Sequence, residues 1–70
     1  MKKKMLEAAL LHFKAEKKKQ EVNLEIYAKA AVGVAEHPDI VSETIELIKK
    51  IAEADECIQI IEEKLIKDSK

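Results

Sequence analysis

The 70-residue sequence has very little of what tight turns, small β-folds and disulfide frameworks require. It contains one glycine, one proline, one cysteine, one phenylalanine, one tyrosine and no tryptophan. So few turn and aromatic residues argue against a small β-barrel or β-sandwich, and a single cysteine excludes an internal disulfide framework. Arginine is absent too, so all thirteen basic residues are lysines, without the planar fork that binds phosphates and guanines in pairs of hydrogen bonds.

What the chain has instead is a composition that favours long amphipathic helices. Hydrophobic residues make up 47% of the sequence and charged residues 39%, chiefly alanine, leucine, isoleucine, glutamate and lysine. This apolar content is too high for a disordered chain, and the length leaves room for one small domain. We therefore expect a single all-α domain over residues 1–70.

The only glycine and the only proline lie five residues apart and mark one break in the chain. Gly33 suits the left-handed position that ends a helix, and Pro38 suits the first turn of a helix, where its missing N–H costs nothing. Asp39 then places negative charge at a helix N-terminus, where the helix dipole favours it. These signals predict a helix over about residues 5–31, a loop over 32–38 and a helix over about 39–67.

The second expected helix carries a regular heptad seam. Mostly apolar residues recur at alternating spacings of four and three over more than three heptads, which is the pattern of a coiled coil. This seam comprises Ile40, Thr44, Leu47, Ile51, Ala54, Ile58, Ile61 and Leu65. A second apolar strip runs beside it through Val41, Ile45, Ile48 and Ala52. So wide an apolar face is typical of a helix that packs against more than one neighbour.

The first expected helix is less regular. Its seam follows the same spacings through Leu6, Leu10, Phe13, Lys17, Gln20, Leu24, Tyr27 and Ala31. The two ends of this seam are apolar, whereas the segment 15–21 at its centre is polar almost throughout. Two alternatives stay open at this point, one continuous helix or a break at the polar centre. Near the loop, Val22 and Ile26 are expected to broaden the packed face.

Folding the two helices antiparallel pairs residues whose numbers add to about 70. This register brings the lysines at 17–19 opposite Glu53, Asp55 and Glu56. Residues 1–20 carry a net charge of +5 and residues 21–70 a net charge of −6, so the basic half of one helix meets acidic residues of the other. Exposed ion pairs contribute only tenths of a kcal/mol each, so we expect the charges to set the register more than the stability.

A lone two-helix hairpin cannot bury both the seam and the strip beside it. Below about 70–80 residues a single core is marginal without a disulfide, a metal or a partner. We therefore expect an antiparallel hairpin that dimerises into a four-helix bundle or forms a coiled-coil-like assembly. The predicted oligomer interface is formed by Leu24, Tyr27, Thr44, Leu47, Ile51, Ile58, Ile61 and Leu65.

The function these features favour is non-enzymatic contact between proteins, as a structural, assembly or adaptor component. A chain this short has little scaffold for a catalytic cleft. The side chains that most often act as ligands or nucleophiles are His12, His37 and Cys57, and they show no metal-binding spacing. We expect no enzymatic activity, no metal and no cofactor. The expected partner is a second copy of the chain, with a different protein as a further partner.

A small nucleic-acid-binding regulator is the alternative function. Its phosphate contacts would come from Lys2, Lys3, Lys4, Lys14, Lys17, Lys18 and Lys19, and dimerisation would double this basic patch. The missing arginines, the scarce aromatics and the twelve acids in residues 21–70 weigh against nucleic acid as a partner. No apolar run approaches the roughly 20 residues of a membrane-spanning helix, so we expect a soluble, cytoplasmic protein that does not bind membranes.

The break between the helices also carries a resemblance. Residues 32–39 read Val-Gly-Val-Ala-Glu-His-Pro-Asp, similar to a loop in short uncharacterised helical proteins of marine tailed bacteriophages and ocean metagenomes. That loop tends to read Pro-Val-Gly-Val-Gly-Glu-His-Pro-Asp, and this chain departs from it at Ala31 and Ala35. The resemblance implies a phage-encoded accessory or virion-related protein, in the host cytoplasm or the virion, with no assigned activity. It directs attention to Glu36 and His37 as a partner-contacting loop, because helix capping explains neither.

Overall fold

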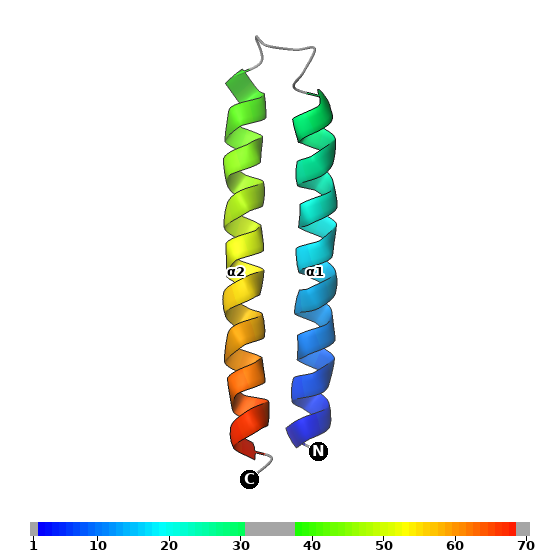
Figure 1. The fold of residues 1–70 in the computed structure, drawn as a ribbon, viewed down its shortest axis with the longest axis vertical. Coiled ribbons are helices and arrows are strands. Elements are labelled where there is room, and N and C mark those ends of the chain that lie inside the picture. Colours follow the sequence, from blue (N-terminus) through cyan, green and yellow to red (C-terminus); the bar gives the residue numbers. More distant parts are fainter. Residues whose placement is uncertain (1, 31–37, 69–70) are drawn as a thin grey trace.

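The computed structural model describes residues 2–30 and 38–68, which form two helices (Figure 1). Helix α1 spans Lys2–Ala30 and helix α2 spans Pro38–Asp68. They run antiparallel and side by side over their full length, and the Cα trace measures about 54 × 13 × 13 Å. Both described segments are helical and neither contains a strand, which confirms the expected all-α helical hairpin.

Helix α1 is continuous through its polar centre, so the alternative of a break there is wrong. Lysine, glutamate, glutamine and alanine are all good helix formers, and they make up this segment almost entirely. Neighbouring turns are also joined by side chains, since the Gln20 amide donates a hydrogen bond to Glu16 at 2.8 Å. The helix begins at Lys2, three residues before the expected start.

Helix α2 begins at the residue type that suits a helix start. Pro38 is its first residue and Asp39 places an acid in the first turn, while Lys67 lies in the last turn, as the helix dipole favours. The one hydroxyl on the α2 seam is satisfied within the helix, because Thr44 Oγ1 donates to the carbonyl oxygen of Ile40 at 2.7 Å. The expected helix-ending role of Gly33 lies outside the described residues.

The buried core is thin and belongs mainly to α2. Leu47, Ala54 and Ile61 are its buried apolar residues, and they are spaced seven residues apart along the seam. On the described part of α1 the buried residue is polar, Gln20. The remaining described seam residues are half-buried. Two helices alone therefore shield one line of side chains and leave the rest of each helix open to solvent.

One expectation about α1 is wrong. Val22 and Ile26 do not broaden the packed face, because both are exposed. At 100° per residue they lie on the side of α1 roughly opposite to Gln20 and the rest of the seam. Their spacing of four residues puts them on a common face, but that face points away from α2.

Candidate interaction surface

The eight residues predicted to form an oligomer interface lie on the faces that α1 and α2 turn toward each other within one chain. Leu47 and Ile61 are buried there. The half-buried members are Leu24, Tyr27, Thr44, Ile51, Ile58 and Leu65. These residues can take part in an oligomer as the shared core of a bundle.

The register between the helices is marked by an ion pair. Lys17 Nζ of α1 lies 2.6 Å from Asp55 Oδ1 of α2, within the pairing expected from the charge pattern. The hydrogen bond that the Lys17 ammonium donates to this carboxylate, reinforced by the opposite charge, raises the pKa of Lys17 above its ordinary value. The lysine lies on the seam, where its aliphatic stem packs while its charged end reaches the flank.

Gln20 forms a polar layer at the centre of the seam. Its Nε2 donates to Glu16 Oε1 at 2.8 Å, and its Oε1 accepts a longer hydrogen bond of 3.4 Å from Asn23 Nδ2. The bond from Gln20 is the main reason that the pKa of Glu16 lies below its ordinary value, with smaller contributions from nearby positive charges. Buried side-chain nitrogen and oxygen atoms of the described residues all have partners. The amide is therefore accommodated without an unsatisfied group.

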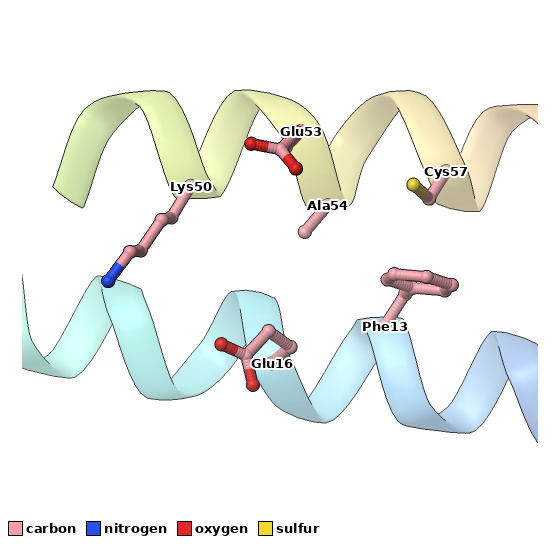
Figure 2. A pocket seen from close by; sticks show the side chains of 6 residues that line it. All are labelled: Phe13, Glu16, Lys50, Glu53, Ala54 and Cys57. Carbon is pink, nitrogen blue, oxygen red and sulfur yellow. The ribbon is translucent and has the colours of Figure 1, made fainter. Parts of the chain in front are cut away.

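One flank of the hairpin, which we call the cysteine flank, is polar and slightly hollow. An open hollow of about 230 Å³ is bordered by Phe13, Glu16, Lys50, Glu53, Ala54 and Cys57. Figure 2 shows the Phe13 ring of α1 facing Cys57 of α2, and the Lys50 side chain extending from α2 toward α1. Charges of both signs line the hollow, and Cys57 is a half-buried free thiol.

The opposite flank, which we call the strip flank, is apolar on α2. Val41, Ile45 and Ile48 expose 62%, 49% and 51% of their surface. The helical repeat places them within about 60° of one another, on a face turned about 100° away from the centre of the seam. Ala52 extends this face by one further turn and is also exposed. The sequence predicts this apolar strip, and in the structure α1 does not cover it.

On the same flank α1 is mostly charged. Lys18, Glu21 and Glu25, together with Val22 and Leu24, border a shallow hollow that Ile51 of α2 completes, next to the apolar strip. The two helices thus present different chemistry on one side of the hairpin, with isoleucine and valine on α2 and three charged side chains beside Val22 and Leu24 on α1. A partner that covers this flank must match both.

No family model matches this chain, and no curated protein or solved structure matches it either. Within residues 2–30 and 38–68, neither helix has the length and apolar character needed to cross a membrane. The same two segments contain no group of three or more His, Cys, Asp and Glu residues placed to hold a metal ion. Inference about function therefore depends on the surface of the hairpin itself.

The lysines of the nucleic-acid hypothesis do not form one uniform patch. Lys17 is paired with Asp55, and Lys18 Nζ lies 3.9 Å from Glu21. The other five are exposed, namely Lys2, Lys3, Lys4, Lys14 and Lys19. The helical repeat spreads those at 3, 4, 14 and 19 over the outer side of α1. The acidic neighbours of Lys17 and Lys18 leave less positive charge for phosphates.

The remaining predicted positions fall into two groups. Glu36 and His37, the expected partner-contacting loop, lie outside the described residues. His12 is exposed, and its ring meets that of Phe13 edge-on, with centroids 4.9 Å apart and planes at 84°.

Sequence reasoning missed the burial of Gln20. Its place on the seam, seven residues after Phe13 and seven before Tyr27, was the signal that could have revealed it.

Proposed function

We propose that this chain is a self-associating helical hairpin that acts through protein–protein contacts, as a structural, assembly or adaptor component. The observation that carries the proposal is the apolar strip of Val41, Ile45 and Ile48 on α2. Single exposed hydrophobic residues are ordinary on protein surfaces, but a contiguous row beside polar residues is typical of an interaction site. Its length along one helix suits another helix as the partner.

The exposed area of the chain supports the same proposal. The hairpin exposes 5728 Å². A compact monomer of its mass would expose about 4,400 Å², so the excess is roughly 1,300 Å². A standard stable interface covers about 800 Å² on each partner. The excess belongs to the whole chain and is larger than one such interface. A second chain on the strip flank would cover part of it and would add apolar burial to a core that has little.

The sequence of the loop at 32–39 extends this proposal to the kind of component. Its resemblance to phage-encoded helical proteins favours an accessory or virion-associated role, in the host cytoplasm or the virion. Short helical hairpins that associate through one flank are suited to such a role, because they present their other surfaces to further partners.

A matched pair of substitutions tests the proposal. Ile48 on the strip and Ile60 off the strip lie on the same helix with similar exposure, 51% and 55%, but about 120° apart around the helix. We expect Ile48→Asp to give a monomer, because a carboxylate buried in the interface lacks a partner. Ile60→Asp should leave the oligomer intact. The measurement is light scattering coupled to size exclusion, with helix content followed by circular dichroism.

Repeating the measurement at several salt concentrations distinguishes an apolar interface from association driven by charge. An apolar interface should persist from low salt to about 0.5 M, because screening acts on charges and not on apolar contacts. A wild-type chain that stays monomeric across the micromolar range would contradict the proposal. So would an oligomer that Ile48→Asp and Ile60→Asp weaken equally. Association that falls steeply as salt rises would point to the lysines instead.

A further inference from the structure

We propose that the second copy packs its α2 against the α2 of the first, antiparallel and staggered, so that the two apolar strips cover each other. This inference rests on the proposed self-association and specifies its geometry. It follows from three features of the strip flank, namely what lies beside the strip, what lies beyond its end, and where its centre falls along the hairpin.

The residues beside the strip decide which helix of the partner covers it. On this flank α1 presents Lys18, Glu21 and Glu25 around a single exposed valine, Val22, whereas α2 presents a continuous row of valine and isoleucine. If the strip of one copy packed against α1 of the other, aliphatic side chains would desolvate those charges without providing hydrogen-bond partners. Packing α2 against α2 buries apolar surface on both sides instead. The polar side chains of α1 then form the rim of the interface, where water still reaches them.

The residues beyond the strip decide the relative direction of the two α2 helices. After Ala52 the same side of α2 continues with Asp55, Gln59 and Glu62 before Ile66. A parallel, in-register pair would gain a contact between the two Ile66 residues but would place Glu62 beside its own copy, and Asp55 as well, whose charge Lys17 partly offsets. Like charges that face each other across helices are destabilising. An antiparallel pair avoids this repulsion.

The centre of the strip fixes the stagger. Val41 to Ala52 has its midpoint between residues 46 and 47, so a two-fold axis there places Val41 opposite Ala52 of the other copy and Ile45 opposite Ile48. This midpoint lies in the loop-proximal half of α2, which spans Pro38–Asp68. The copies therefore overlap through that half, and their acidic C-terminal halves extend in opposite directions. Asp55 and Glu62 of each copy then lie away from their counterparts.

Distances between spin labels on two copies test this geometry. Ser42 and Glu63 are exposed and lie three heptads apart on one side of α2, so each can be replaced by cysteine in a Cys57→Ser background and labelled. At 1.5 Å per residue, a two-fold axis at 46–47 separates the two copies along the axis by about 14 Å at Ser42 and by about 50 Å at Glu63. We expect a short distance for Ser42→Cys and a long one for Glu63→Cys by double electron–electron resonance.

Each alternative gives a different pair of distances. Two short distances would mean a parallel pair, and two similar distances near 30 Å would mean an antiparallel pair without the stagger. Either result would overturn this inference while leaving self-association intact. A monomeric mass for the Cys57→Ser chain, with native helix content and no distance between copies, would overturn the proposed function as well. Dilution of labelled with unlabelled chain must remove the signal, which identifies it as interchain.

Discussion

The two helices of this hairpin contribute differently to it. Helix α2 contributes the buried apolar residues of the seam, Leu47, Ala54 and Ile61, which recur every seven residues. At the centre of helix α1 the seam residues are polar: Gln20 has a buried amide, and the ammonium group of Lys17 contacts Asp55. Apolar burial is not specific for register, whereas polar groups that need partners are. The contrast indicates that α2 supplies most of the buried apolar side chains and that the Lys17–Asp55 pair, which joins the two helices, helps to specify how they align.

The largest expected effect comes from a charge placed in the seam of α2. Ile51 is half-buried there and shares a hollow with Leu24 of α1. Ile51→Asp should cost about 3 kcal/mol or more, because the carboxylate lacks a partner, and should abolish both the cooperative thermal transition and the oligomer. Circular dichroism melting and light scattering measure the two effects. If the variant melts like Ile60→Asp, whose site is exposed, α2 does not carry the stability.

A smaller effect of opposite sign is expected at the centre of α1. Gln20→Leu removes both hydrogen bonds, but Glu16 and Asn23 are half-buried and can regain water. The exchange should therefore stabilise the fold by about 1 kcal/mol in urea denaturation. Because both hydrogen bonds lie within α1, the register should be kept, seen as one set of amide peaks in the nuclear magnetic resonance spectrum. A destabilised variant, or one with several sets of peaks, would contradict this expectation.

The smallest expected effect is a change in acid sensitivity at Glu16. The pKa of this carboxyl is lowered from 4.5 in the folded chain, mainly by the hydrogen bond from Gln20. The folded state therefore binds the proton less readily than the unfolded state, and the stabilisation is present above the ordinary pKa and is lost as the pH falls through the lowered one. Glu16→Gln should lower the melting temperature at about pH 7 but not at about pH 3. Glu25→Gln, at an exposed site on the same helix, is the control for the charge change itself.

Much of the fold could be predicted because α2 is locally consistent. Its seam residues recur at one heptad spacing, and Pro38 with Asp39 marks its start, so pattern and helix-start signals agree. The register could be anticipated because charges of opposite sign were segregated between the two halves of the chain, and the Lys17–Asp55 pair lies where that pattern placed it.

The centre of α1 was harder to interpret for a physical reason. Hydrophobic periodicity counts Lys17 and Gln20 as interruptions of a seam, although a lysine stem can pack and an amide can find partners one turn away on its own helix. Both occur here, and the pattern of apolar residues reveals neither. The prediction for Val22 and Ile26 was wrong because their four-residue spacing shows that they share a helix face but not which face is buried.

The shape of the hairpin has a consequence for how it tumbles. The Cα trace is about four times longer than it is wide, and the two helices run along its long axis. Amide N–H bonds in a helix lie nearly along the helix axis. The amides of both helices therefore sense end-over-end rotation almost alone, and this rotation slows steeply as a rod lengthens. Nuclear relaxation rates of these amides would report the length of an assembly, whereas scattering reports its mass.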